Sequence, residues 1–254
     1  MKKTFWGGRR YCSIDYMLKE RYSEKLYKLS LNGGMTCPNR DGKISEGGCI
    51  FCSAGGSGDF AANFNPDIAK QIEQAKTLVS KKYQGDRFIA YFQAYTNTYA
   101  PVEYLRKLFM DTIMRDDIAI LSIATRPDCL GDDVIELLAE LNRIKPVWVE
   151  LGLQTINEST ARLINRGYEL SCYDEAVRRL RNIGVEIITH MIIGLPYETK
   201  EDILSTAEYI GKTANGIKLQ LMHILKNTKL LEMYEKGEFK ALTEEEYIEI
   251  VCEI

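Results

Sequence analysis

Three cysteines stand close together in the chain, with eleven residues between Cys37 and Cys49 and two between Cys49 and Cys52. Thiolates are soft, electron-donating ligands that suit iron–sulfur clusters and zinc, and a Cys-x-x-Cys pair can hold one such centre. Structural zinc usually takes four protein ligands, and His190 and His223 belong to distant segments. The spacing favours a 4Fe-4S cluster on three cysteines, ahead of structural zinc and of unrelated buried or redox thiols.

A cubane cluster with three cysteine ligands keeps one iron open to an outside ligand, such as the amine and carboxylate of an amino acid. Once reduced, a cluster of this kind can pass an electron into the sulfonium of S-adenosylmethionine (SAM) and release a carbon radical. The difficult chemistry would then belong to the cofactor. The three cysteines are therefore the candidate catalytic residues, acting through the metal centre.

Four further cysteines lie in unrelated segments and repeat no Cys-x-x-Cys spacing: Cys12, Cys129, Cys172 and Cys252. We interpret them as ordinary buried or surface thiols, although either Cys12 or Cys129 could approach the mouth of the barrel. An odd total of seven cysteines in 254 residues favours reduced thiols over disulfides.

The elements that must position these cysteines follow from an alternation of short apolar runs with amphipathic stretches, which is typical of parallel strands joined by crossover helices. Six strands are expected, at 27–31, 87–94, 118–124, 147–153, 186–193 and 217–222. Helical patterns fall between them at 66–83, 101–115, 132–143, 173–183 and 200–213. Eight such units would close a barrel, so the sequence predicts an α/β fold, a partial (βα)6 barrel of the TIM type. The cysteine stretch follows the first strand, at the end of the barrel where chemistry is found.

The length and the 45% apolar content suit a single domain covering 1–254. We divide it into an N-terminal extension at 1–26, the six-unit core at 27–222 and C-terminal helices at 223–254. The chain ends inside an amphipathic pattern without a visible cap, which suggests that a natural C-terminal segment is missing.

The charge pattern gives no general attraction to polyanions, since 33 basic and 36 acidic residues leave a net charge of −3. Two local clusters are basic: Lys2, Lys3, Arg9 and Arg10 near the start, and Arg178, Arg179 and Arg181 in a predicted helix. Solvated surface charge is the commoner explanation of such clusters. The start lacks the apolar core of a signal peptide and no apolar run reaches eighteen residues, so we expect a cytoplasmic protein without a membrane partner.

The cysteine stretch also resembles a known family. Phe51 precedes the last cysteine, Gly55-Gly56-Ser57-Gly58 follows it, and this pattern resembles the radical SAM superfamily. More closely it is similar to the YtqA/YhcC-like group, relatives of the elongator catalytic subunit. The superfamily commonly has three residues between its first two cysteines, whereas the eleven found here resemble the longer loop of the elongator-like branch. The resemblance implies that the cofactors are a 4Fe-4S cluster and SAM.

Further stretches resemble the family in order along the chain. Residues 91–98 take the place of its glycine-rich second-strand motif without the glycines, which leaves Tyr95 and Thr96 as the implied contacts to the methionine amino group. Residues 122–128 resemble its third-strand motif, but Ala124 stands where relatives often carry a ribose-binding glutamate. Glu150, on the next strand, is the implied replacement.

The later strands continue the resemblance. Gln154 ends a stretch that looks like the family's fourth strand, and Arg166 lies where an arginine usually reaches the SAM carboxylate. His190 and Gly194 belong to a stretch like the fifth-strand motif, beside the ribose and adenine. The implied SAM contacts are Phe51, Tyr95, Thr96, Glu150, Gln154, Arg166, His190 and Gly194. Each also has an ordinary explanation, as a strand-end polar group, a helix cap, a core histidine or a turn.

The resemblance implies reductive cleavage of SAM to a 5′-deoxyadenosyl radical, with an electron from a partner such as flavodoxin or ferredoxin. Kinship with the elongator subunit favours tRNA, at the wobble uridine, as the substrate. Phe5, Trp6 and Tyr11, interleaved with the N-terminal basic residues, would then stack on bases; the same segment could instead cap the bottom of the barrel. The alternatives are radical chemistry on a small metabolite or peptide, and a zinc-stabilised binding protein without catalysis.

Overall fold

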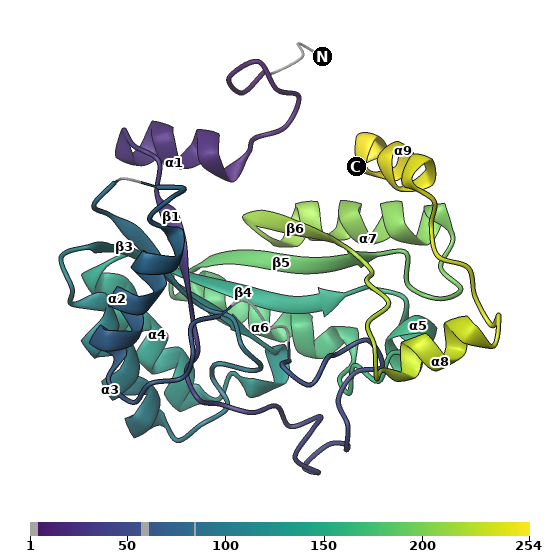
Figure 1. Cartoon of the computed structure of the whole chain (residues 1–254), viewed down its shortest axis with the longest axis horizontal. Coiled ribbons are helices and arrows are strands. Elements are labelled where there is room, and N and C mark those ends of the chain that lie inside the picture. Colours follow the sequence, from purple (N-terminus) through teal and green to yellow (C-terminus); the bar gives the residue numbers. More distant parts are fainter. Residues whose placement is uncertain (1–4, 57–60, 84) are drawn as a thin grey trace.

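The fold is built on one six-stranded parallel sheet (Figure 1). The computed structural model describes residues 5–56, 61–83 and 85–254. The strands pair in chain order, each parallel to the next. Their bounds are β1 Tyr27–Leu31, β2 Phe88–Phe92, β3 Ile118–Thr125, β4 Val147–Gln154, β5 Glu186–Ile193 and β6 Gly216–Leu221.

The helices between the strands cover the outer face of the sheet (Figure 1). Every residue of β2 and β3 is buried, which is expected of a parallel sheet covered on both faces. The bounds are α1 Ile14–Tyr22, α2 Ile68–Val79, α3 Val102–Ile113, η1 Pro127–Cys129, α4 Asp132–Ile144, α5 Glu158–Leu163, α6 Leu170–Asn182, α7 Lys200–Thr213, α8 Lys229–Glu235 and α9 Glu244–Glu253. Helix α1 precedes the sheet, and α8 and α9 follow it.

The sheet curls into a half-barrel. Lys28 on β1 forms an ion pair with Glu150 on β4, although three strand spacings of about 4.8 Å would hold these strands apart in a flat sheet. The predicted partial (βα)6 barrel of the TIM type is therefore confirmed. The curl turns one face of the sheet into an interior, and side chains from β1 and β4 meet across it.

Helix α1 lies at the bottom of the half-barrel, where the strands begin. Leu18 packs with Ile89, Ile120 and Trp148, which stand near the starts of β2, β3 and β4. Within the N-terminal extension predicted at 1–26, this helix thus covers the end of the barrel opposite the cysteines, while Lys2 and Lys3 lie outside the described residues. The division of the chain into one domain stays a prediction.

Most expected elements are found with small shifts at their ends. The second strand is shorter than predicted, Phe88–Phe92 rather than 87–94, because the chain then turns to the cysteine loop, where the N–H groups of Tyr95 and Thr96 donate to Gly56 and Thr36. Helices α1 and α5 were not predicted. Helix α5 spans only six residues, too few for a helical period to stand out, although Asn157 caps it through Ser159 and Thr160. No helix among the described residues is long and apolar enough to cross a membrane.

Candidate active site

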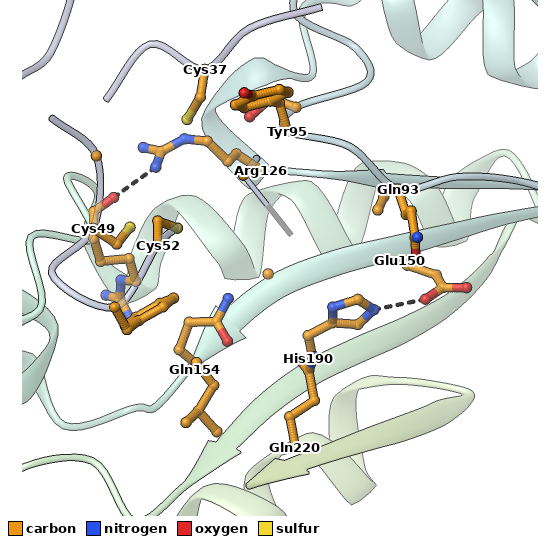
Figure 2. A pocket seen from close by; sticks show the side chains of 18 of the residues that line it. Cys37, Cys49, Cys52, Gln93, Tyr95, Arg126, Glu150, Gln154, His190 and Gln220 are labelled. Atoms are coloured by element: carbon orange, nitrogen blue, oxygen red, sulfur yellow. Dashed lines mark hydrogen bonds and ion pairs between the residues drawn. The ribbon is translucent and has the colours of Figure 1, made fainter. Parts of the chain in front are cut away.

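A pocket of about 290 Å³ opens where the strands end, with the cysteine loop on one wall (Figure 2). Ten of the residues predicted for the site line it: Cys37, Cys49, Phe51, Cys52, Tyr95, Thr96, Glu150, Gln154, Arg166 and His190. The exception is Gly194, which is not among the lining residues. It has φ +91° in the turn after β5, where an added Cβ would meet Leu242 at 3.0 Å.

Two asparagines hold the cysteine loop against the segment after α5. The Asn39 amide is fully buried and donates to the backbone oxygen of Asn165 at 2.6 Å and to Cys49 Sγ at 3.6 Å. In return, the Asn165 amide donates to the oxygen of Gly48 at 2.9 Å. These contacts fix the position of Cys49. Neither asparagine was predicted from the sequence, because each bonds a residue more than a hundred positions away in the chain.

Arginines give the cysteine wall a positive potential. A hydrogen bond with Cys52 lowers the pKa of Cys49 to about 7, with further contributions from Arg126 and Arg40, while burial opposes the shift. The Arg40 guanidinium itself donates to the backbone oxygens of Ser53 and Ala54. Cationic neighbours favour the thiolate, which is the form that binds a metal.

The three thiols face one pocket, but they do not surround a single ion. Among the described residues, no three His, Cys, Asp or Glu side chains stand close enough to hold one metal ion. A cubane cluster binds each thiolate at a different iron, so it accepts sulfurs that are further apart. Cys37, Cys49 and Cys52 therefore fit a cluster better than a closed zinc site.

Packing against Tyr95 explains Gly56, one of the glycines after the last cysteine. Gly56 has φ +56°, and a Cβ there would come within 2.2 Å of the Tyr95 ring. The Tyr95 hydroxyl donates to the backbone oxygen of Ala54 at 2.7 Å, and its backbone has φ +61°. Tyr95 thus closes one side of the pocket, while Ser57 and Gly58 of the same motif lie outside the described residues.

Gln154 presents an unsatisfied polar atom to the pocket. Its backbone has φ +71° beside an irregularity in the pairing of β4 and β5. Its side-chain oxygen is buried and has no hydrogen-bond partner among the described residues. A buried acceptor without a partner costs about 1–3 kcal/mol, so this oxygen fits a site that a ligand completes.

Arg166 lines the pocket but is already bound on all sides. It is 2% exposed, and it donates to the backbone oxygens of Thr155 at 2.7 Å and Tyr168 at 3.0 Å and to Glu158 at 3.1 Å. The structure shows it fastening the segment after β4. Its predicted bond to the SAM carboxylate stays a prediction.

Arg126 also lines the pocket, and sequence reasoning did not select it. It forms a two-pronged ion pair with Asp128, and it donates to the backbone oxygen of Arg166 at 2.9 Å. The sequence offered one signal, because an arginine directly after a buried strand stands at the catalytic end of a barrel.

Glu150 and His190 form a pair deeper in the half-barrel. The Glu150 side chain is fully buried, and its Oε2 lies 2.7 Å from His190 Nε2 (Figure 2). Ser122 donates to Oε1 at 2.7 Å, and Lys28 forms an ion pair with the same oxygen. Although burial opposes it, the hydrogen bond with His190 and the charges of Lys28 and Lys218 keep the pKa of Glu150 well below its usual range, and burial lowers that of His190.

The sequence was also compared with known protein families, and the matches agree with the cysteines, the pocket and the half-barrel. Residues 37–210 match the radical SAM superfamily, and residues 214–254 match the radical SAM C-terminal domain. The chain belongs to the radical SAM superfamily. It is therefore an enzyme whose cofactors are a 4Fe-4S cluster and SAM.

Relatives place the chain within that superfamily. It is 47% identical over 246 residues to the uncharacterized protein YtqA of Bacillus subtilis, covering 96% of this chain and 76% of that protein. YhcC of Escherichia coli is 39% identical over 232 residues, covering 91% of this chain and 74% of YhcC. These similarities confirm the predicted YtqA/YhcC-like group.

More distant similarities lead to the elongator-like branch. A tRNA uridine(34) acetyltransferase of Methanocaldococcus infernus is 28% identical over 138 residues, covering 52% of this chain and 25% of that protein. The solved structure of Elp3 from the same archaeon, with an N-terminal deletion, superposes with a TM-score of 0.66 at 21% identity. The match covers 90% of this chain and 53% of that structure, and it shows a shared fold.

Proposed function

We propose that Cys37, Cys49 and Cys52 hold the 4Fe-4S cluster, and that the chain reductively cleaves SAM there in order to modify the wobble uridine of tRNA. When bound, the cluster and SAM supply a 5′-deoxyadenosyl radical that takes a hydrogen atom from the substrate. One observation carries the proposal: three thiols line the same pocket as the amide oxygen of Gln154, which has no hydrogen-bond partner in the described part of the chain. A reductant of the flavodoxin or ferredoxin type would supply the electron.

The SAM contacts that we propose come from the walls of this pocket. Gln154 offers its free oxygen to an amine or hydroxyl donor of SAM. Thr96, which is buried, and the backbone oxygen of Tyr95 suit the methionine amino group, since both can accept its hydrogen bonds. Phe51 stands between two of the cysteines and offers an apolar surface for the adenine. We assign Gly194 a role in forming the turn after β5, and no direct contact with SAM.

His190 is the proposed ribose contact, with Glu150 as its positioning residue. The Glu150 carboxylate binds one ring nitrogen and fixes the imidazole, and the other nitrogen lies on the pocket side (Figure 2). Glu150 already accepts from Lys28 and Ser122 as well. A direct ribose bond to this carboxylate would have to displace one of these donors, so we assign it the indirect role.

Support for tRNA comes from the relatives and from the N-terminal segment. The distant relative from Methanocaldococcus infernus acts on tRNA uridine, according to its name. In this chain Arg9 and Arg10 are exposed ahead of α1, and the Arg9 guanidinium lies over the exposed Tyr11 ring at 5.9 Å. Exposed cations beside aromatic rings suit phosphates and unstacked bases.

A gel-shift titration of the reconstituted protein with total tRNA tests the substrate class. Binding should be detected at about 50 mM salt, and it should weaken strongly at about 200 mM if phosphate contacts carry it. Reversing the charge of Arg9 and Arg10 together should reduce the affinity, whereas Lys107→Glu, at an exposed lysine of α3, should have little effect. Equal binding by all three proteins, or none by the wild type, would move the proposal to a small metabolite or a peptide.

A further inference from the structure

A cluster of charged groups fills the interior of the half-barrel behind the SAM contacts. Lys28 and Lys218 both form ion pairs with Glu150, the second at 3.5 Å. Both ammonium groups also lie over the Tyr91 ring, at 4.3 Å and 5.0 Å from its centroid. Lys218 stands beside His190 in the pairing of β5 and β6. Five strands thus direct charged or polar groups to one place.

This cluster carries one positive charge in excess. Two ammonium groups, Lys28 and Lys218, face one carboxylate, Glu150. Burial lowers the pKa of His190, so the imidazole is neutral near neutral pH, and burial raises that of Tyr91, so the phenol is neutral too. The Lys28 and Lys218 side chains are only partly exposed, and burial lowers the pKa of Lys218. A counter-ion supplied by a ligand would therefore offset part of the cost of holding both ammonium groups here.

The loosest member of the cluster is Lys218. Both oxygens of Glu150 are taken at closer range by other donors, which leaves the ammonium of Lys218 at 3.5 Å. Besides this distant contact with Glu150, Lys218 donates a hydrogen bond to the neutral Tyr91 hydroxyl, at 3.1 Å. An ammonium has three donors, so at least one remains for another acceptor. Lys218 also lines the pocket, and its side chain is 36% exposed.

Two glutamine side chains line the same pocket as the Lys218 ammonium. Gln220 follows Lys218 by two positions on β6, so both side chains lie on the same face of the sheet. Gln93, just after β2, also lines the pocket (Figure 2). Neither glutamine side chain is hydrogen-bonded to another described residue. An ammonium with neighbouring amide donors is the chemistry that binds an anionic oxygen group.

We propose that Lys218, assisted by Gln220, binds an anionic group of the substrate, a carboxylate or a phosphate, inside the half-barrel. The inference rests on the proposed function, because it places the substrate beside the SAM contacts of the same pocket. It adds a substrate class: the molecule or nucleotide that enters carries a negative charge. Glu150 competes with that group for Lys218, and so it sets how tightly the anion is held.

Equilibrium dialysis tests this subsite directly, with the reconstituted holoprotein, SAM, and labelled inorganic phosphate or labelled acetate as probes. Wild type should bind at least one probe. Lys218→Met should weaken binding by about 10-fold or more, since hydrogen bonds to charged groups are strong, and Lys218→Arg should restore most of it. Glu150→Gln should change binding in the opposite direction and tighten it several-fold, because the competing charge is gone.

The matched control is Lys212→Met, which removes an exposed ammonium that pairs with Glu208 and should leave probe binding unchanged. Preference for phosphate identifies a nucleotide phosphate as the source of the anion, and preference for acetate identifies a carboxylate. No binding by wild type, or equal binding by wild type and Lys218→Met, overturns the subsite. SAM binding by the wild type is measured in parallel, and its absence overturns the proposed function instead, whatever the probes do.

Discussion

Replacing Glu150 by Gln should lower the free energy of unfolding by about 3 kcal/mol. The carboxylate is fully buried and has Lys28, Ser122 and His190 as hydrogen-bond partners. Removing one partner of a buried ion pair costs about 3–5 kcal/mol because the other charge stays buried. Glutamine has nearly the same shape and keeps one acceptor oxygen, so we expect the lower end of that range. Two ammonium groups would then share the interior without a counter-ion.

Urea unfolding of the wild type and the variant, followed by fluorescence of the buried Trp148 and by circular dichroism, measures this difference. Glu208→Gln is the matched control, since its pair with Lys212 is exposed on α7 and such pairs contribute little to stability. Lys28→Met in the Glu150→Gln background should recover part of the loss. Equal costs for Glu150→Gln and Glu208→Gln would refute the reasoning.

The pH dependence of the same pair gives a second check on Glu150. The folded state holds the pKa of this carboxyl below the value in the unfolded chain, which is about 4.3. Its contribution to stability is therefore present above about pH 4.3 and is lost as the pH falls through the lower, folded value. The stability difference between wild type and Glu150→Gln should narrow in acid, and a difference that stays constant from pH 7 down to acid would contradict this.

Three further predictions concern Gln154 and Arg166 of the pocket and Glu198, whose carboxylate accepts a hydrogen bond from Thr155 after β4. Gln154→Leu should weaken SAM binding by about 5–10-fold in calorimetry, because one hydrogen bond is lost, and unchanged affinity would remove Gln154 from the SAM contacts. Arg166→Met should cost about 3 kcal/mol in urea unfolding, because it leaves buried backbone oxygens without donors; a cost below about 1 kcal/mol would mean that this guanidinium is not structural. Burial raises the pKa of Glu198 to about 7, above its unfolded value, so wild type should lose stability as the pH rises from about 4.3 to 7. Glu198→Gln should remove that loss. If the melting temperatures of the two proteins change with pH in the same way across this range, the prediction is wrong.

The strands and the cysteine site were predictable because their signals are local. A buried parallel strand is a short apolar run, and this signal identified β3 and β4 to within one residue at each end. Cys37, Cys49 and Cys52 are likewise close in sequence, so their common pocket followed from their place after β1.

The remaining parts depend on contacts between distant segments. Asn39 and Asn165 hold the cysteine loop in place across more than a hundred residues. Lys28 contacts Glu150 only because the sheet curls, and no sequence pattern within β1 or β4 predicts this ion pair. Arg166 was selected for its position relative to the family pattern, while its many backbone contacts became visible only in the folded chain.

The most direct test of the account is anaerobic reconstitution with iron and sulfide, followed by dithionite and SAM. Iron content and 5′-deoxyadenosine are measured for the wild type and for Cys49→Ala, with Cys129→Ala as the control for a cysteine outside the proposed cluster. Wild type and Cys129→Ala should bind about four irons per chain and form deoxyadenosine, and Cys49→Ala should do neither. Bound zinc without deoxyadenosine, or full activity in Cys49→Ala, would contradict the claim that these three cysteines hold the catalytic cluster.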